Sequence, residues 1–518
     1  MTYRQLGGLI GRVAGALAAV GVRGGDRLLI VLPTSPQAVA AYYACNSLGA
    51  VAAIVHPLST AVEMERFARA SGARVAVALD ALYERLRPAL DAGALDTLVL
   101  TRVGDGLSRL RRTAFRLTQG WKTPRVPPDP RVRWWADLLA RPHPQPASAS
   151  RDPGTLGTIL FSGGTTGLPK GIMLTDSNIV SEGLQVAGWI GMREGDRVLA
   201  ALPLFHGFGL STLVNAPLMS GCRVILVPKF SPEIIAGVIR RSHPNFIAGV
   251  PSLYDALTRR DALRGVDLSC IKAAFSGGDT LPAPVKLKFD RLLAGSGSST
   301  RLMEGYGLTE NVTAAIVMPL HHERAGSVGV PLPDTLVTIR DTESGRELPV
   351  GEAGEICISG PSVMLGYLDD PASTAVALRR HEDDRIWLHT GDVGRRDEDG
   401  FFYFLGRRKR MIKSSGFNVF PAEVEQVLCD HPDVAESYVL GMPENGRGER
   451  VKAFVVPADP VAATPALVAR LMAHCRGRLS PWSCPREIEL RRELPKNRVG
   501  KVDERALLQG ASSMGAIP

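Results

Sequence analysis

The chain has 518 residues, of which 45% are hydrophobic and 22% are charged, and its formal net charge is +9. This length exceeds what one ordinary hydrophobic core supports, so we expect two or more domains in a globular protein. The positive charge favours acidic partners such as nucleotides, coenzyme A or anionic lipid, but it is dispersed and accompanies no nucleic-acid-binding motif, so nucleic acid is not an expected partner.

Cysteine usage and hydropathy bear on the compartment. The seven cysteines are scattered without a C-x-x-C pair, which predicts reduced thiols in a cytoplasmic protein rather than a disulfide framework or a metal site. No continuous apolar stretch follows Arg4, so no secretory signal is expected. The apolar segment 38–55 is interrupted by Asn46, Ser47 and Gly49, and we predict a buried helix and strand there instead of a membrane span.

The first 153 residues alternate helical and strand patterns, which is typical of an α/β layer structure. A helical pattern over residues 6–17 precedes a predicted buried strand over 26–32. The same order recurs with a helix over 63–70 and a strand over 75–78. We therefore expect a sheet covered by helices in the N-terminal region.

Residues 107–121 predict a basic amphipathic helix, with three leucines and Trp121 on one face and three arginines on the other. One interpretation, which we favour, is a helix packed on its own domain with a solvated arginine face. The other is peripheral contact with an anionic membrane surface. The proline-rich run over 123–130 is expected to form an exposed connector.

The segment from Phe161 to Gly171 has the composition of a phosphate-binding loop. Its glycines free backbone N–H groups, its hydroxyls add donors, and its lysine adds a positive charge. It is not a Walker loop, because Leu168 and Pro169 precede the lysine and Gly171 stands where a magnesium-binding hydroxyl would be needed. The candidate phosphate ligands are Ser162, Gly163, Gly164, Thr165, Thr166, Gly167 and Lys170. A short strand is expected just before this segment, over 154–161, and a helix capped by residues 175–177 just after it.

Two weaker signals follow. His206 lies among aromatics and glycines in a turn that suits the lining of an apolar pocket, although a buried, hydrogen-bonded histidine is commoner than a functional one. Gly277 and Gly278 follow a strand-like stretch over 271–275, where glycines let a flat ring such as adenine approach the backbone. A plain turn between strand and helix is the alternative there.

The stretch Glu304-Gly-Tyr-Gly-Leu-Thr-Glu310 is more specific. Tyr306, between two glycines, can present its ring to a base, Thr309 can donate to a phosphate, and Glu310 can hold a divalent cation. Further along, Asp392 ends the stretch Trp387-Leu-His-Thr-Gly-Asp and can accept from both ribose hydroxyls. These residues predict a nucleotide site.

These segments, in this order over residues 3–508, resemble the adenylate-forming superfamily of acyl-CoA synthetases, luciferases and adenylation domains. The usual loop there is Thr-Ser-Gly-Thr-Thr-Gly, so Gly163 departs by losing one hydroxyl, in a double-glycine form similar to that of the long-chain fatty acyl-CoA ligase branch. The resemblance implies an α/β fold whose large N-terminal domain holds α/β subdomains and a β-barrel-like subdomain, followed by a small mobile α+β domain. The implied boundaries are 1–407, a hinge at 408–410, the mobile domain at 411–508 and a tail at 509–518.

The resemblance also implies a reaction: ATP-dependent activation of a carboxylic acid, with a medium or long fatty acid expected, to acyl-AMP, and then thioester formation with coenzyme A. ATP, Mg²⁺ and coenzyme A are the implied cofactors. Lys501 on a glycine turn would be the mobile catalytic lysine, and His206 would lie at the carboxylate end of the acyl pocket. Catalytic roles would also fall to Thr309 and Glu310, Mg²⁺ would bind Glu310 and Thr165, and nucleotide or coenzyme A contacts would involve Gly277, Gly278, Tyr306, Gly307, Asp392, Arg407, Lys409 at the hinge and Gly416.

Two alternatives stay open. The acceptor could be the phosphopantetheine arm of an acyl carrier protein, or the acid could be an aryl acid. No large insertion separates Gly360 from Arg407, which favours coenzyme A. A catalytically silent binding protein would not need to keep Glu310, Asp392 and Lys501 together. The sequence does not distinguish a monomer from a homodimer.

Overall fold

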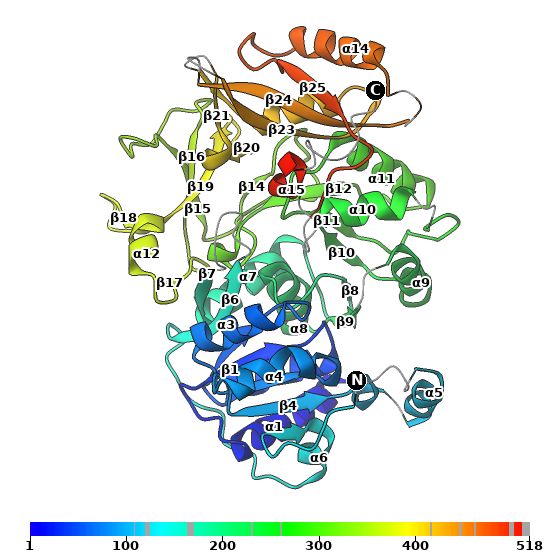
Figure 1. Cartoon of the computed structure of the whole chain (residues 1–518), viewed down its shortest axis with the longest axis vertical. Coiled ribbons are helices and arrows are strands. Elements are labelled where there is room, and N and C mark those ends of the chain that lie inside the picture. Colours follow the sequence, from blue (N-terminus) through cyan, green and yellow to red (C-terminus); the bar gives the residue numbers. More distant parts are fainter. Residues whose placement is uncertain are drawn as a thin grey trace. The chain divides into compact units, whose positions relative to one another are not determined.

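The computed structural model describes residues 1–107, 109–119, 125–162, 170–228, 231–259, 262–414, 417–444, 448–459, 461, 463–496 and 502–509. Its contacts divide the chain into two compact units. Figure 1 labels the helices and strands. The first unit comprises Met1–Ser231, Leu308–Ala314 and Gly360–Ile386, and the second comprises Pro232–Gly307, Ala315–Ser359 and Trp387–Pro518. Each unit is described by itself.

The first unit alternates strands and helices for most of its length. Its elements are α1 (Tyr3–Ala19), β1 (Arg27–Val31), α2 (Pro36–Ser47), β2 (Val51–Ile54), α3 (Ala61–Ser71), β3 (Val75–Leu79), η1 (Asp80–Leu82), α4 (Tyr83–Asp91), β4 (Thr97–Thr101), η2 (Val103–Gly106), α5 (Arg109–Gln119), β5 (Val132–Trp134), α6 (Trp135–Ala140), β6 (Leu156–Ser162), β7 (Lys170–Thr175), α7 (Asp176–Trp189), β8 (Arg197–Ala200), the π-helix η4 (Phe208–Asn215), α8 (Ala216–Met219), β9 (Arg223–Leu226), η5 (Thr309–Asn311), β17 (Gly366–Tyr367), α12 (Pro371–Ala377) and β18 (Leu378–Arg380).

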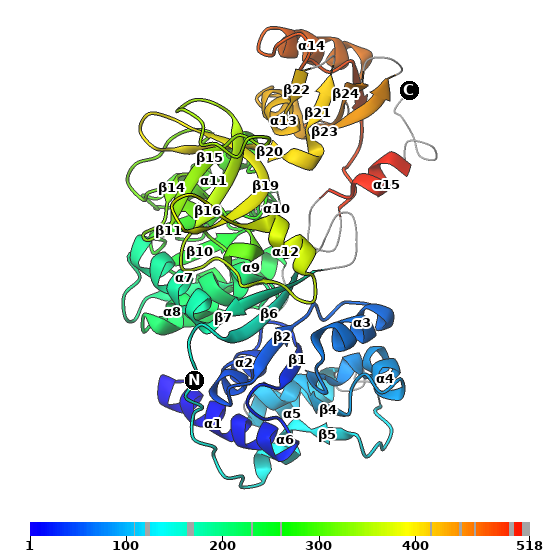
Figure 2. The same cartoon turned by 90° about the vertical axis from the view of Figure 1, so that its left-hand side faces the viewer.

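One eight-stranded sheet organises this unit, in the order β17-β7-β6-β2-β1-β3-β4-β5. The strands from β6 to β5 are parallel, whereas β7 and β17 are antiparallel to their neighbours. Figure 2 shows α2 on one side of β1 and β2, with α3 and α4 on the other side. Because both faces are covered, the central strands are buried along their length, as in β2, whose four residues are all buried.

The predicted elements of this unit are present. Residues 38–55 form α2 and β2, and both are largely buried, as predicted. α1 and α3 begin with capping boxes, at Thr2 with Gln5 and at Thr60 with Glu63, which satisfy the first N–H groups of each helix. The helices expected over 6–17 and 63–70 therefore form, and each begins a few residues earlier, at its capping box.

The helix α5 differs from its favoured interpretation. Leu110 is 86% exposed and Leu117 is 80% exposed, so the prediction that the apolar face packs on its own domain is wrong for these residues. The side that contacts the domain includes Arg112, whose Nε donates to the carbonyl of Gly104 at 2.8 Å. The helix therefore presents leucines outward.

The second unit begins with another parallel arrangement and ends with antiparallel strands. Its elements are α9 (Pro232–Ser242), β10 (Phe246–Gly249), α10 (Pro251–Arg259), β11 (Ala273–Ser276), α11 (Ala283–Gly295), β12 (Leu302–Tyr306), β13 (Ile316–Val317), β14 (Val330–Pro331), β15 (Leu336–Arg340), β16 (Gly354–Ser359), β19 (Ile386–Arg396), β20 (Phe402–Arg407), η6 (Arg408–Arg410), β21 (Ile412–Ser414), β22 (Phe417–Val419), α13 (Pro421–Cys429), β23 (Val434–Glu444), β24 (Gly448–Pro457), α14 (Pro465–Arg476), β25 (Glu487–Leu490) and α15 (Glu504–Gln509).

Three sheets of this unit matter for the site. In the first, β10, β11 and β12 are parallel, and β13 and β14 continue antiparallel from β12. In the second, β15, β16, β19 and β20 pair in that order, all antiparallel. Among the described residues this second sheet is open, so the subdomain expected to resemble a barrel is not a closed one.

The third sheet lies in the C-terminal part and has the order β22-β21-β24-β23, with β25 parallel to β24. Its core is separate and includes Val424 and Leu428 of α13 and Leu467 and Leu471 of α14. A small α+β C-terminal domain, as the resemblance implies, is therefore present, while its boundaries at 411–508 stay a prediction. Among the described residues, no helix combines the length and apolar character needed to cross a bilayer.

Candidate active site

The predicted phosphate loop connects the antiparallel strands β6 and β7. Ser162 and Lys170 are register partners at the end of this hairpin, so the connection leaves and re-enters the sheet at one point. The candidate ligands Gly163, Gly164, Thr165, Thr166 and Gly167 lie outside the described residues, as does the side chain of Ser162. Their role stays a prediction. The strand expected before the loop is β6, whereas β7 was not predicted.

Lys170, at the start of β7, contacts residues of the segment Gly360–Ile386, which belongs to the same unit. Its Nζ donates to Ser373 Oγ at 2.6 Å and lies 3.5 Å from Asp370 Oδ2. The ammonium group also lies 4.6 Å from the ring centroid of Tyr367. This lysine is therefore held beside the phosphate-loop hairpin by residues near β17.

The same tyrosine contacts the predicted metal ligand. The hydroxyl of Tyr367 donates to Glu310 Oε1 at 2.9 Å, and the backbone N–H of Met364 donates to the Glu310 carbonyl at 2.9 Å. Glu310 lies in the 3₁₀ turn Thr309–Asn311. The structure thus joins Glu310 to Lys170 through Tyr367, a connection that sequence analysis did not predict.

The His206 segment lies against the segment after Glu310. A Cβ on Gly207 would lie 1.9 Å from the carbonyl oxygen of Val312, so only glycine permits this backbone contact. Val312 itself has a φ of +58°, which is strained for a β-branched residue. The exposed His206 accepts from the Phe208 N–H through Nδ1 at 3.2 Å. The structure therefore brings His206 and the Thr309–Val312 segment together, as a common site requires.

A buried carboxylate supports both segments. Glu182 of α7 accepts from Ser211 Oγ, from Thr212 Oγ1 at 3.3 Å and from the Ala314 N–H at 3.4 Å. Burial raises the pKa of Glu182 to about 7, against the lowering effect of these hydrogen bonds. Ser211 and Thr212 belong to the π-helix η4, which begins two residues after His206. Glu182 thus fixes η4 relative to Ala314.

The second unit brings together Tyr306 and Asp392, two predicted nucleotide contacts. The Tyr306 hydroxyl donates to Asp392 Oδ2 at 2.8 Å, and Arg407 Nε lies 3.3 Å from Asp392 Oδ1. Burial, and next the charge of Asp392, raise the pKa of Tyr306 well above its usual value, so its hydroxyl remains a donor. The contact between Tyr306 and Asp392 was not predicted, and stacking of this ring on a base stays a prediction.

The predicted glycines lie at strand ends. Gly277 directly follows β11 and donates its N–H to the Gly249 carbonyl at 3.1 Å. Gly278 has a φ of +81°, which glycine adopts without strain. Gly307 directly follows β12. This placement is the one that an approaching flat ring would need, and adenine binding stays a prediction.

The predicted hinge lies in the 3₁₀ turn Arg408–Arg410, directly after β20. Lys409 is exposed there. Arg410 is anchored instead, because its Nη2 donates to Glu425 Oε1 at 2.9 Å. Gly416 and Lys501 lie outside the described residues, so their roles also stay predictions.

Comparison with known proteins gives a consistent result. A family model described as AMP-binding enzyme matches residues 1–368, and one described as AMP-binding enzyme C-terminal domain matches residues 423–501. A long-chain-fatty-acid–CoA ligase of Bacillus subtilis (strain 168) is 35% identical over 511 residues, covering 96% of this chain and 88% of the relative. A feruloyl-CoA synthase of Amycolatopsis sp is 32% identical, covering 97% and 92%.

Solved structures agree with the fold. The crystal structure of ATP-bound MatB from Rhodopseudomonas palustris has a TM-score of 0.84 and 28% identity, covering 99% of this chain and 93% of that one. The anthranilate CoA ligase AuaEII in complex with anthranoyl-AMP has a TM-score of 0.84 and 26% identity, with the same coverage of 99% and 93%.

Proposed function

Since the chain belongs to the AMP-binding enzyme family and is an ATP-dependent acid–thiol ligase, we propose that its acid is a medium-chain or long-chain fatty acid and its thiol is coenzyme A. The observation that carries this proposal is the 35% identity, over 96% of the chain, to a long-chain-fatty-acid–CoA ligase. We propose a cytoplasmic location for it.

The first half-reaction needs electrostatic stabilisation more than acid–base catalysis. A free carboxylate resists a thiol because its leaving group would be oxide, and coupling to AMP replaces that leaving group with a better one. The ionised carboxylate attacks the α-phosphorus of ATP as pyrophosphate departs, so no general base is needed. Charge on the phosphoryl oxygens would be met by Lys501 and by the loop that ends at Lys170.

Mg²⁺ is part of this proposal. Glu310, with Thr165, would hold it. A carboxylate whose orientation is fixed by a hydrogen bond from a hydroxyl is an oxygen ligand that suits this hard cation. When bound, the cation would neutralise charge on the phosphate oxygens. Tyr367 would keep the Glu310 carboxylate in one orientation for that task.

The second half-reaction needs a different geometry. A thiolate must reach the acyl carbonyl from the side that Lys501 would block. We propose that a C-terminal domain over 411–508 turns about a hinge at 408–410, with Lys409 as the pivot, so that the loop at Gly416 lines the pantetheine channel. The large domain would then comprise residues 1–407.

A pyrophosphate-release panel tests the substrate class. Acids from C2 to C18 and a set of benzoates are each assayed with ATP, with and without coenzyme A. We expect the highest kcat/KM for acids of about C8 or longer, with thioester formed only when coenzyme A is present. A maximum among the benzoates would contradict the fatty-acid proposal.

A second candidate is an aryl acid–CoA ligase, because the feruloyl-CoA synthase is 32% identical and the anthranilate CoA ligase shares the fold. The same panel separates the two candidates. Turnover that needs a carrier protein instead of coenzyme A would identify the third, a carrier-loading ligase.

We also propose that α5 contacts an anionic membrane surface, from which a fatty acid would be taken. Leu110 and Leu117 are 86% and 80% exposed on one face of a helix that holds four arginines. Leucines facing outward with arginines beside them are typical of interfacial helices. The double variant L110S/L117S should lose sedimentation with vesicles containing phosphatidylserine, whereas L58S, which removes another exposed leucine, should not. Equal binding by all three proteins would contradict the proposal.

A further inference from the structure

The strand β19 contains a bulge at the residues that lead to Asp392. Its register with β16 pairs His389 with Cys357 and Val393 with Glu355. Three residues of β19 therefore stand opposite the single residue Ile356. A bulge leaves backbone groups without their ladder partners, and these need other hydrogen bonds when they are buried.

Glu355, which is only 4% exposed, supplies one of those hydrogen bonds. Its Oε1 accepts from the Gly391 N–H at 2.9 Å, and its Oε2 lies 2.9 Å from His389 Nδ1. Thr390 completes the arrangement, because its Oγ1 donates to the Ile356 carbonyl at 2.7 Å and accepts from the Asp392 N–H at 3.1 Å. One carboxylate thus holds His389, where the bulge begins, and Gly391, in its middle.

The charge of Glu355 is consistent with these contacts. Burial tends to raise its pKa, but the hydrogen bonds from His389 and Gly391 outweigh burial and lower it. The carboxylate is therefore ionised at neutral pH and acts only as an acceptor, so Nδ1 of His389 carries the donated proton. A buried ionised carboxylate is expensive unless several donors converge on it, and here two do.

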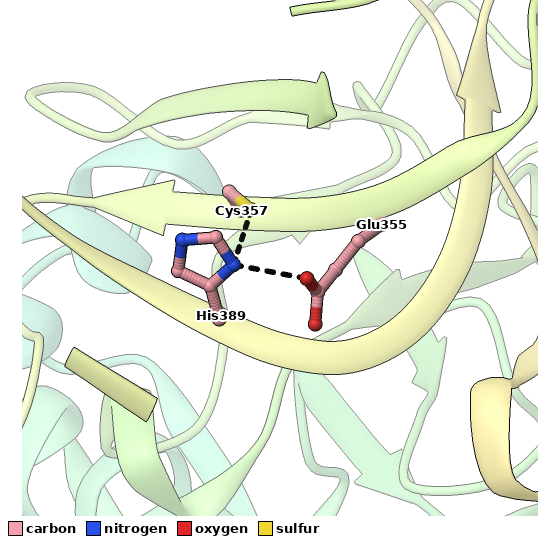
Figure 3. Close-up of side chains that lie close together, drawn as sticks. All are labelled: Glu355, Cys357 and His389. Atoms are coloured by element: carbon pink, nitrogen blue, oxygen red, sulfur yellow. Dashed lines mark hydrogen bonds and ion pairs between the residues drawn. The ribbon is translucent and has the colours of Figure 1, made fainter. Parts of the chain in front are cut away.

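Figure 3 shows Glu355 and Cys357 of β16 and His389 of β19 pointing toward one another. Cys357 Sγ lies 3.5 Å from His389 Nδ1, so the three side chains could also be considered as metal ligands. A metal would have to take the Glu355 and His389 atoms that already close the bulge. The hydrogen bond from the Gly391 N–H to Glu355 favours the role of holding the bulge over the role of metal ligand.

We propose that Glu355 is a positioning residue for the nucleotide site, which holds the bulge so that the carboxylate of Asp392 faces the ribose hydroxyls. Asp392 follows Gly391 directly, and its own carboxylate is bounded by Tyr306 and Arg407. Gly391 has a φ of +71°, so the turn depends on a residue that its neighbours must hold in place. The inference rests on the proposed function, because it assumes that Asp392 binds ribose.

The test measures nucleotide binding directly, by calorimetry with ATP, 2′-deoxy-ATP and 3′-deoxy-ATP, for wild type, E355A, E355Q and C357S. Nucleotide binding is measured without the acid substrate. A wrong assignment of the acid would therefore show in the pyrophosphate panel but would leave this measurement unchanged. A carboxylate that receives a ribose hydroxyl strengthens binding by about tenfold to a hundredfold. Wild type should therefore bind ATP more tightly than either deoxy analogue by that factor.

In E355A this preference should fall to less than about threefold, through weaker ATP binding with nearly unchanged binding of the deoxy analogues. E355Q should keep most of the preference, since its amide oxygen can accept from Gly391 and its amide nitrogen can donate to a neutral His389. C357S should behave as wild type. If E355A does not fold, E355Q provides the test. A folded E355Q that lost the preference for ATP at pH 6 to 8 would contradict the expectation that glutamine holds the bulge in place of Glu355.

Equal weakening of all three nucleotides in E355A would overturn the proposal, because it would indicate a general structural role. An unchanged preference in E355A would do the same. One equivalent of zinc in the purified protein, lost in C357S, would assign Glu355 to a metal site instead.

Discussion

Replacing the buried Glu182 by glutamine should make the stability of the first unit less dependent on pH. In the wild type, Glu182 accepts from Ser211, Thr212 and the Ala314 N–H inside the protein. Glutamine has the same shape and no charge, and its amide nitrogen can donate to the Ser211 hydroxyl, which also accepts. The substitution therefore removes the ionisation and keeps most of the contacts.

The magnitude follows from the pKa. Burial raises the pKa of Glu182 from 4.5 to about 7 in the folded protein. Because the folded state binds its proton more tightly than the unfolded state, the contribution to stability is present below pH 4.5 and is lost as the pH rises through 7. Between pH 5 and pH 8 the wild type should lose about 2.5 kcal/mol relative to E182Q. For a unit of this size, that is a shift of about 5 °C in Tm.

The assay is thermal unfolding of wild type and E182Q at pH 5 and pH 8, in the same salt. Taking the difference between the two proteins at each pH removes the contributions of all other titrating groups. E304Q gives a parallel test in the second unit, because burial also raises the pKa of Glu304 to about 7, and its Tm should differ from that of the wild type in the same pH-dependent way. A Tm difference between E182Q and wild type that is the same at both pH values would refute the reasoning.

Three further outcomes are expected. Y367F removes the hydroxyl that donates to Glu310, so the Mg²⁺ concentration for half-maximal pyrophosphate release should rise about tenfold with little change in the KM for the acid, and an unchanged Mg²⁺ dependence would count against this role. K501A should lower adenylation by about 10² to 10³ while thioester formation from preformed acyl-AMP is largely retained, and equal losses in both halves would contradict the division of labour. D370A should lower the KM for ATP if Asp370 competes with phosphate for Lys170, as measured by initial rates, and a higher KM would indicate that Asp370 instead orients the lysine.

The strands and helices around the site could be predicted because their signals are local. The stretch before the phosphate loop predicted a strand, which is β6. The polar residues from Thr175 predicted a helix start, and Thr175 Oγ1 accepts from the Asn178 N–H at 2.9 Å. Such signals depend on residues within a few positions of one another, where capping chemistry decides the outcome.

Contacts between distant segments could not be predicted in the same way. Gly207, just before the π-helix, packs against Val312, about a hundred residues further along the chain. The role of Tyr367 depends on β17 pairing with β7 across the sheet edge. Neither the residue types nor their spacing indicates these partners, since a glycine after a histidine and a tyrosine after a glycine are common in turns.

The outward leucines of α5 show a different limit. The helical period correctly predicted one apolar and one basic face, but it does not say which face meets the domain. The contact of Arg112 with the Gly104 carbonyl decides that question, and it comes from the turn just before the helix. Only the folded chain therefore distinguishes a packed helix from one that offers its leucines to another surface.

Two buried glutamates, one in each unit, support backbone turns beside predicted site residues, and their donors explain why they differ. Glu355 receives a backbone N–H and an imidazole N–H, both at 2.9 Å, and its pKa is lowered. Glu182 receives two hydroxyls and a longer N–H bond at 3.4 Å, and its pKa is raised because burial outweighs them. A permanently ionised carboxylate suits Glu355, because protonation would remove one of the two acceptor oxygens that hold the bulge before Asp392. Between these two residues, the pH sensitivity of folding near pH 7 should therefore come from Glu182, and the nucleotide preference should stay constant over the same range.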